Sequence, residues 1–155
     1  MIQTSQTISV AINGTTYERE VDARKLLIHF VRDDLDLTGS HIGCDTGNCG
    51  ACSMIVDGTL VKSCMLLAVQ ADGATIETVE GLADGEELSK LQVAFREQHA
   101  LQCGYCTPGM LMSATALLRD NPHPSDEEIR KGLQGNICRC TGYWNIFEAV
   151  KAASE

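Results

Sequence analysis

The chain has 155 residues, of which 44% are hydrophobic and 21% are charged, and its formal net charge is −9. This acidic balance argues against a nucleic-acid partner, since no cluster of Lys and Arg offsets it. The length suits one domain or two small ones, and two small cores would gain from metal cross-links.

The sequence contains no pattern for export or for membrane insertion. The segment Met1-Ile-Gln-Thr-Ser5 lacks the basic and apolar regions of a signal peptide, and the longest purely apolar run is Met65–Val69. We therefore expect no membrane span and a cytoplasmic protein, which partners could hold at the inner membrane face. In a reducing compartment, the eight cysteines are better interpreted as metal ligands than as disulfides.

Two β-hairpins are predicted in the first half of the chain. Apolar and polar residues alternate over 8–12 and again over 17–21, on either side of Asn13-Gly14, a strong hairpin signal. The second hairpin covers residues 53–63 and turns at Asp57-Gly58.

A helix and a last strand complete this half. Asp22 is placed to cap a helix that ends near Leu35 and buries one face, made of Leu26, Leu27, Phe30 and Val31. Residues 75–79 read as a strand. The order strand–strand–helix–strand–strand is that of a β-grasp fold.

A cysteine loop at residues 40–52 separates the helix from the second hairpin. Its cysteines, with one more after the hairpin, have the spacing C-x4-C-x2-C…C of plant-type [2Fe–2S] ferredoxins: Cys44, Cys49, Cys52 and Cys64. Three glycines in this loop allow a tight wrap that points backbone N–H groups at the sulfurs: Gly43, Gly47 and Gly50.

From about residue 86 onward the patterns predict helices. One helix includes Leu88, Leu91 and Phe95 on its apolar face, and a second begins near Pro108 and ends before Asn121. A third opens at the capping box Ser125-Asp-Glu-Glu128, and the last carries Trp144, Phe147 and Val150. The change from strand patterns to helical patterns places a domain boundary between about 79 and 86.

This helical half contains the other four cysteines, in Cys103-Gly-Tyr-Cys106 and Cys138-Arg-Cys140. A C-x2-C pair alone also fits zinc or a thioredoxin-like site, but the βαβ context of thioredoxin is absent and C-x-C is unusual for zinc. Two pairs at helix ends suit a compact anionic cluster, because helix N-termini after Pro108 and Tyr143 would direct positive dipole ends toward it. Paired zinc sites and a disulfide scaffold remain the less favoured alternatives.

Two longer motifs resemble one family closely: Gln102-Cys-Gly-Tyr-Cys-Thr-Pro-Gly109 and Gly135-Asn-Ile-Cys-Arg-Cys-Thr-Gly-Tyr143. Together they look like the small iron–sulfur subunit of the molybdenum hydroxylases. This group includes xanthine dehydrogenase, aldehyde oxidoreductases, N-heterocycle dehydrogenases and aerobic carbon monoxide dehydrogenase. Three shorter stretches look most like the carbon monoxide dehydrogenase branch: 27–30, 41–46 and 61–64.

The resemblance implies an α+β protein with two [2Fe–2S] domains. Residues 1–80 would form a plant-ferredoxin-like β-grasp domain, and residues 81–155 an all-α four-helix bundle. The outer site would consist of Cys44, Cys49, Cys52 and Cys64, and the inner site of Cys103, Cys106, Cys138 and Cys140. Gln102 and Cys140 would lie beside the molybdopterin. Because the cysteines complete both sites, His29 and His41 are expected not to be ligands.

The function implied is electron relay inside a larger oxidoreductase. The chain would pass electrons from molybdopterin on a large subunit to FAD on a medium subunit, in a dimer of heterotrimers. No nucleophile, general base or phosphate-loop motif is evident in the chain itself, so no catalytic residue is predicted. Two rivals are a free-standing two-cluster shuttle, which would elute near its own mass, and a zinc-binding module, which would be colourless.

Overall fold

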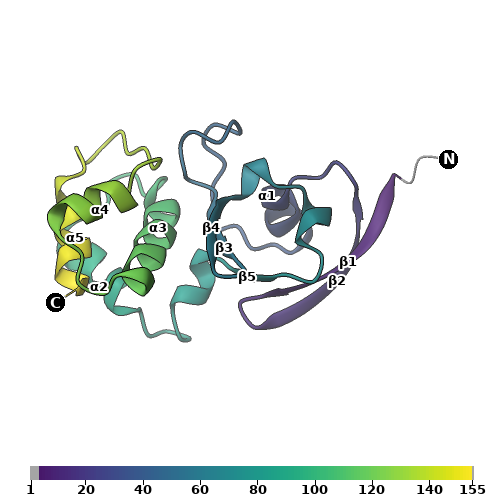
Figure 1. Ribbon diagram of the computed structural model, residues 1–155, viewed down its shortest axis with the longest axis horizontal. Helices are drawn as coiled ribbons and strands as arrows, with labels where there is room; N and C mark the ends of the chain where they lie inside the picture. Colours follow the sequence, from purple (N-terminus) through teal and green to yellow (C-terminus); the bar gives the residue numbers. More distant parts are fainter. Residues whose placement is uncertain (1–3, 155) are drawn as a thin grey trace.

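The computed structural model describes residues 4–154. Figure 1 shows a β-sheet on one side of the molecule and a group of helices on the other. Met1, Ile2 and Gln3, on which the expectation of no export signal partly depends, lie outside the described residues, as does Glu155. Within residues 4–154, every helix is too short or too polar to cross a membrane.

The sheet has five strands in the order β2-β1-β5-β3-β4. In chain order these are β1 (Ser5–Ile12), β2 (Thr15–Asp22), β3 (Ser53–Val56), β4 (Thr59–Lys62) and β5 (Thr75–Glu77). The two antiparallel hairpins are confirmed, and β5 lies between them, parallel to β1 and antiparallel to β3. Asn13 and Gly14 both have positive φ, at 49° and 81°, as this two-residue turn requires.

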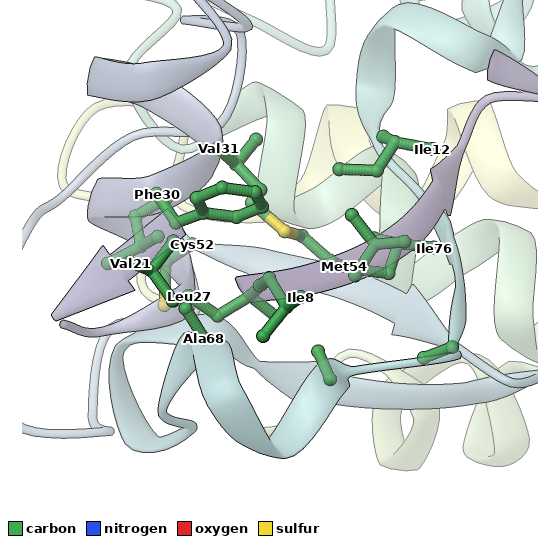
Figure 2. Close-up of a cluster of buried hydrophobic side chains, with 14 of the residues drawn as sticks. Ile8, Ile12, Val21, Leu27, Phe30, Val31, Cys52, Met54, Ala68 and Ile76 are labelled. Carbon is green, nitrogen blue, oxygen red and sulfur yellow. The ribbon is translucent and has the colours of Figure 1, made fainter. Parts of the chain in front are cut away.

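The first helical segment packs on the sheet and closes the N-terminal core. It consists of α1 (Leu27–His29) and a π-helical continuation over Phe30–Asp34. Figure 2 shows its apolar side chains, Leu27, Phe30 and Val31, among those of Ile8, Met54 and Ile76 from three strands. Cys52 belongs to the same buried cluster, so this core supports one wall of the outer site.

This segment begins later than the sequence predicts, and Asp22 is not its cap. The Asp22 carboxylate instead accepts the N–H of Arg24 at 2.8 Å and pairs with the Arg24 guanidinium. Leu26 is held extended in a β-bridge with Leu67, and Leu27 N–H donates to Leu66 O at 2.8 Å. These pairings hold the chain out of a helix until Leu27.

The second half contains the four helices that the sequence predicts. They are α2 (Lys90–Glu97), α3 (Thr107–Asp120), α4 (Asp126–Gly132) and α5 (Trp144–Ser154). Ser125 caps α4 with the predicted box. Leu88, predicted on the apolar face of α2, lies before its Ser89 cap and is 44% exposed. Trp144, one of the three residues that indicated the last helix, is the first residue of α5 and is 63% exposed.

The two halves meet where α3 packs against β3 and β4. As a result, β3 is buried on both faces, and Met54 and Ile55 are each 1% exposed or less. A second core, of Phe95, Met110, Ile146 and other residues, lies among the helices. The architecture confirms the α+β fold class, and it places residues of both cysteine sets at the junction of the halves.

Candidate iron–sulfur sites

The outer loop wraps its backbone around the thiol of Cys44. Asn48 and Cys49 each direct a backbone N–H at this sulfur at 3.3 Å, and Thr46 does so at 3.5 Å. The wrap uses left-handed backbone at Gly47 (φ 74°), which glycine adopts without strain. The N–H of Cys49, followed by the groups of Thr46, lowers the pKa of Cys44 to about 6, which favours the metal-binding thiolate.

Two of the other outer thiols, those of Cys52 and Cys64, are buried at the open end of the second hairpin. Cys52 directly precedes β3, and Cys64 lies in a turn of 3-10 helix after β4. Burial, and then the adjacent Cys52 thiol, raise the pKa of Cys64 to about 11. The fold therefore brings the four residues of the predicted outer site together, with Cys52 and Cys64 as a buried pair.

The inner residues lie where the start of α3 meets the loop before α5. The sulfurs of Cys103 and Cys140 are 3.5 Å apart, and both residues are exposed. Beneath them, burial and then a hydrogen bond to Cys138 raise the pKa of Cys106 to about 12. The inner set is thus two pairs, one at the surface and one more enclosed.

A short turn after the C-x-C motif supports Cys138. The Thr141 hydroxyl lies 3.1 Å from Cys138 Sγ and the Thr141 N–H lies 3.5 Å from it, while the Tyr143 hydroxyl accepts the Cys138 N–H at 3.1 Å. Burial opposes the Cys138 thiolate, but the Thr141 groups, the Cys140 N–H and the Cys106 thiol together outweigh it, so the pKa of Cys138 lies below its usual value. The roles of Thr141 and Tyr143 were not predicted, because a Thr or Tyr in a loop carries no signal of its own.

The two cysteine sets share a wall, in which residues 47–50 of the outer loop lie against residues 135–137 of the inner one. Ile137 donates its N–H to the carbonyl oxygen of Cys49 at 2.9 Å, which joins the outer loop to the residue preceding Cys138. A Cβ added at Gly50 would lie 2.5 Å from Gly135 O, so only glycine fits this approach. Lys62 also reaches the wall, because its ammonium donates to Gly47 O at 2.7 Å.

The residues present fit two iron–sulfur groups. All eight cysteines are free thiols, and among residues 4–154 no three Cys, His, Asp or Glu side chains converge on a single ion-sized point. Within the described chain, the buried side-chain atoms without a hydrogen-bond partner are Ser40 Oγ, Thr107 Oγ1 and Asn136 Oδ1, all next to the cysteine segments. The hydroxyls of Ser40 and Thr107 can donate to a sulfide-containing anion, whereas the amide oxygen of Asn136 can only accept.

A cavity of about 170 Å³ lies between the two sets. Residues of both sites line it: Gly43, Cys49, Ala51, Cys103, Tyr105, Cys106, Ile137, Cys138 and Arg139. Gln102 lies outside this cavity lining. It is exposed beside Cys103, and its side-chain amide has no hydrogen-bond partner among residues 4–154.

Two family models match the chain. One, described as a 2Fe-2S iron-sulfur cluster binding domain, matches residues 10–89, and the other, described as a [2Fe-2S] binding domain, matches residues 78–151. The gamma subunit of caffeine dehydrogenase from Pseudomonas sp. (strain CBB1) is 52% identical over 97% of this chain and 92% of its own. The small subunit of nicotine 6-hydroxylase from Paenarthrobacter nicotinovorans is 54% identical over 92% of this chain and 86% of its own.

A solved structure agrees with these matches. A chain in the crystal structure of quinoline 2-oxidoreductase from Pseudomonas putida 86 superposes with a TM-score of 0.95 at 47% identity, covering 98% of this chain and 95% of that one. Fold and thiol arrangement together define a two-centre [2Fe–2S] electron-transfer protein. More specifically, the chain belongs to the small iron–sulfur subunits of the molybdenum hydroxylases. It is an electron-transfer subunit of such a multi-subunit complex.

Proposed function

We propose that the eight cysteines hold two [2Fe–2S] clusters in four thiolate pairs. The observation that carries this assignment is the pairing itself: Cys103 with Cys140 at 3.5 Å, Cys106 with Cys138, and Cys52 with Cys64. Cys44, on whose sulfur the Cys49 N–H converges, forms the fourth pair with Cys49. Each pair would hold one iron. When bound, each cluster accepts and releases one electron.

The inner site is the one we place beside molybdopterin. Its Cys103–Cys140 pair is exposed, and the unpaired amide of Gln102 lies next to it, able both to donate and to accept hydrogen bonds. A pterin edge presents both kinds of group, so this surface suits the large subunit. The outer loop would then face FAD on the medium subunit, with the 65% exposed Met65 beside it.

For the assembled enzyme we propose oxidation of an N-heterocyclic ring by a cytoplasmic dimer of heterotrimers. The names of the three relatives given above identify their substrates as caffeine, nicotine and quinoline. None of these three is a carbon monoxide dehydrogenase, so the branch that the sequence favoured gains no support from them. Eight cysteines of which none forms a disulfide suit a reducing compartment.

The assignment of the inner site is tested by Gln102→Leu in the assembled complex. The variant leaves pterin groups without a partner, which costs ~1–3 kcal/mol locally. We expect slower reduction of both iron–sulfur signals by caffeine, nicotine or quinoline, whichever reduces the wild type. Reduction by dithionite and an iron content of about four per chain should not change.

Two further variants make this test specific. Gln98→Leu changes an exposed glutamine at the end of α2 and should behave as wild type. Cys64→Ser should remove the outer signal and FAD reduction, while the heterocycle still reduces the inner site. If Gln102→Leu instead impaired only delivery to FAD, the order of the two sites would be reversed.

A further inference from the structure

Tyr105 connects the inner cysteine loop to the outer one through three separate contacts. Its ring stacks on His41 with centroids 4.6 Å apart and planes inclined by 24°. Its hydroxyl donates to the carbonyl oxygen of Ile42 at 2.6 Å. Its own carbonyl oxygen lies 2.8 Å from Nδ1 of His41. All three contacts are made to two adjacent residues of the outer loop, His41 and Ile42.

The contact between His41 and the Tyr105 carbonyl fixes the proton on the imidazole. A carbonyl oxygen can only accept a hydrogen bond, so Nδ1 of His41 must carry the hydrogen. The ring therefore presents its donor to the inner loop and its face to the Tyr105 ring. Both rings are thereby held in one relative orientation.

These contacts end close to proposed ligands on both sides. Tyr105 immediately precedes Cys106, while Ile42 lies two residues before Cys44. The backbone N–H of His41 donates to the carbonyl oxygen of Ala51 at 3.1 Å, next to Cys52. A displacement of Tyr105 would therefore be transmitted to both sides of the outer loop.

We propose that His41 and Tyr105 form a clamp that fixes the separation of the inner and outer sites, and so sets the rate of electron transfer between them. Both are positioning residues. The step moves one electron from the inner site to the outer site without making or breaking a bond, and substrate oxidation at molybdenum supplies it. The proposal depends on the ligand assignment above.

Side chains are essential to this clamp, unlike the backbone contacts that also join the two loops. The bond from Ile137 N–H to Cys49 O involves backbone only, and Gly50 and Gly109 contribute by lacking a side chain. His41 and Tyr105 can therefore be varied while those links remain. This makes the spacing of the loops open to a graded test.

Four variants in the assembled complex separate the contacts. Tyr105→Phe removes only the bond to Ile42, and Tyr105→Leu also removes the stack. His41→Asn keeps a side-chain N–H donor but removes the ring, and His41→Leu removes both. His29→Leu is the control, because His29 pairs with Asp33 on the helical segment.

Two measurements report the separation and the rate. One is the dipolar interaction between the two paramagnetic centres after dithionite reduction. The other is the relaxation of one electron between the sites after delivery from the methyl viologen radical. In the two Leu variants we expect a broadened dipolar distribution and relaxation slowed by about two- to tenfold. Tyr105→Phe and His41→Asn should lie between these and wild type, while His29→Leu should match wild type.

The outcomes distinguish the clamp from the ligand assignment. A wild-type complex without two paramagnetic signals would contradict the assignment itself. Two normal signals, with unchanged dipolar interaction and relaxation in all four variants, would overturn the clamp alone. If the Leu variants lose iron, the dipolar interaction and the relaxation rate of Tyr105→Phe and His41→Asn decide whether the pair acts as a clamp. Wild-type behaviour in both of these would show that the pair serves only to retain iron.

Discussion

Lys62 brings a positive charge to the wall between the two sites. Its ammonium donates to Gly47 O at 2.7 Å and lies 3.4 Å from Asn48 O, both in the outer loop. A Cβ added at Gly135 would lie only 3.2 Å from the same nitrogen, so the charge also adjoins the inner loop. A cation in this position favours the more negatively charged, reduced state of the group that the outer loop holds.

We expect Lys62→Gln to lower the reduction potential of the outer site. Removing one unit of positive charge near the surface is worth ~1 kcal/mol, which corresponds to about 40 mV for one electron. A redox titration followed by electron paramagnetic resonance measures this shift. Lys90→Gln, which removes the same charge from the first turn of α2, should leave the potential unchanged. An outer potential that stays constant or rises would show that Lys62 acts only through its hydrogen bonds.

Helix α3 approaches the outer loop so closely that its glycine, Gly109, cannot be replaced by a residue with a side chain. A Cβ added at Gly109 would overlap the carbonyl oxygen of Gly50 and lie 3.0 Å from Ala51 Cα. Both neighbours are backbone atoms, which cannot rotate away. Gly109 is thus the residue that allows a helix of one half to touch the cysteine loop of the other.

Gly109→Ala should therefore destabilise the protein, although alanine normally favours a helix by about 1 kcal/mol. We expect a loss of ~1–3 kcal/mol in the free energy of unfolding, together with reduced iron at both sites. Thermal melting and iron analysis test this result. Gly132→Ala is the matched control, because the three atoms nearest to its added Cβ all belong to the side chain of Leu117, which can move. Equal melting temperatures for the two variants would contradict the close-contact explanation.

The elements that the sequence predicts correctly are those whose signals are local. Asn13-Gly14 sets its own turn, and Ser125 caps α4 through a residue only three positions away. The start of α1 could not be predicted, because Leu26 is held extended by Leu67, some forty residues later. Cysteine spacing indicated both sites in advance. The contact of Tyr105 with His41 carried no such signal, since two aromatic rings far apart in sequence say nothing about their packing.

On the scale of the whole molecule, one ion pair joins the two halves at a point away from the cysteines. Arg119 of α3 donates two hydrogen bonds of 2.6 Å to the carboxylate of Glu77 in β5. The Arg119 hydrogen bonds lower the pKa of Glu77 and outweigh the opposing effect of its partial burial. Because the Glu77 pKa is lower in the folded protein than in the unfolded chain, the pair stabilises the fold where the carboxylate is ionised.

The pair should make part of the stability depend on pH. Its contribution is complete above the unfolded pKa of Glu77, near 4.5, and is lost as pH falls through the lower folded value. Since the side chains of Arg119 and Glu77 are 50% and 35% exposed, we expect only about 0.5 kcal/mol. The difference in melting temperature between wild type and Arg119→Gln, followed from about pH 7 to 3, should shrink on the acid side.

A control isolates this effect from general acid unfolding. Arg96→Gln removes an exposed arginine whose contact with Glu97 is 4.0 Å long and lies within the helical half. Its melting temperature should differ little from wild type throughout the same range. A difference for Arg119→Gln that is independent of pH would show that Arg119 contributes through packing rather than through its charge.

The wall shared by the two sites affects how the protein loses its iron. Gly50 lies against Gly109 on one side and Gly135 on the other, so neither cysteine loop has a backing that belongs to its own half alone. Oxidative loss of iron from one site should therefore loosen the backing of the other. We expect the second site of an ageing sample to lose its iron faster once the first site is empty than it does in a fully loaded molecule.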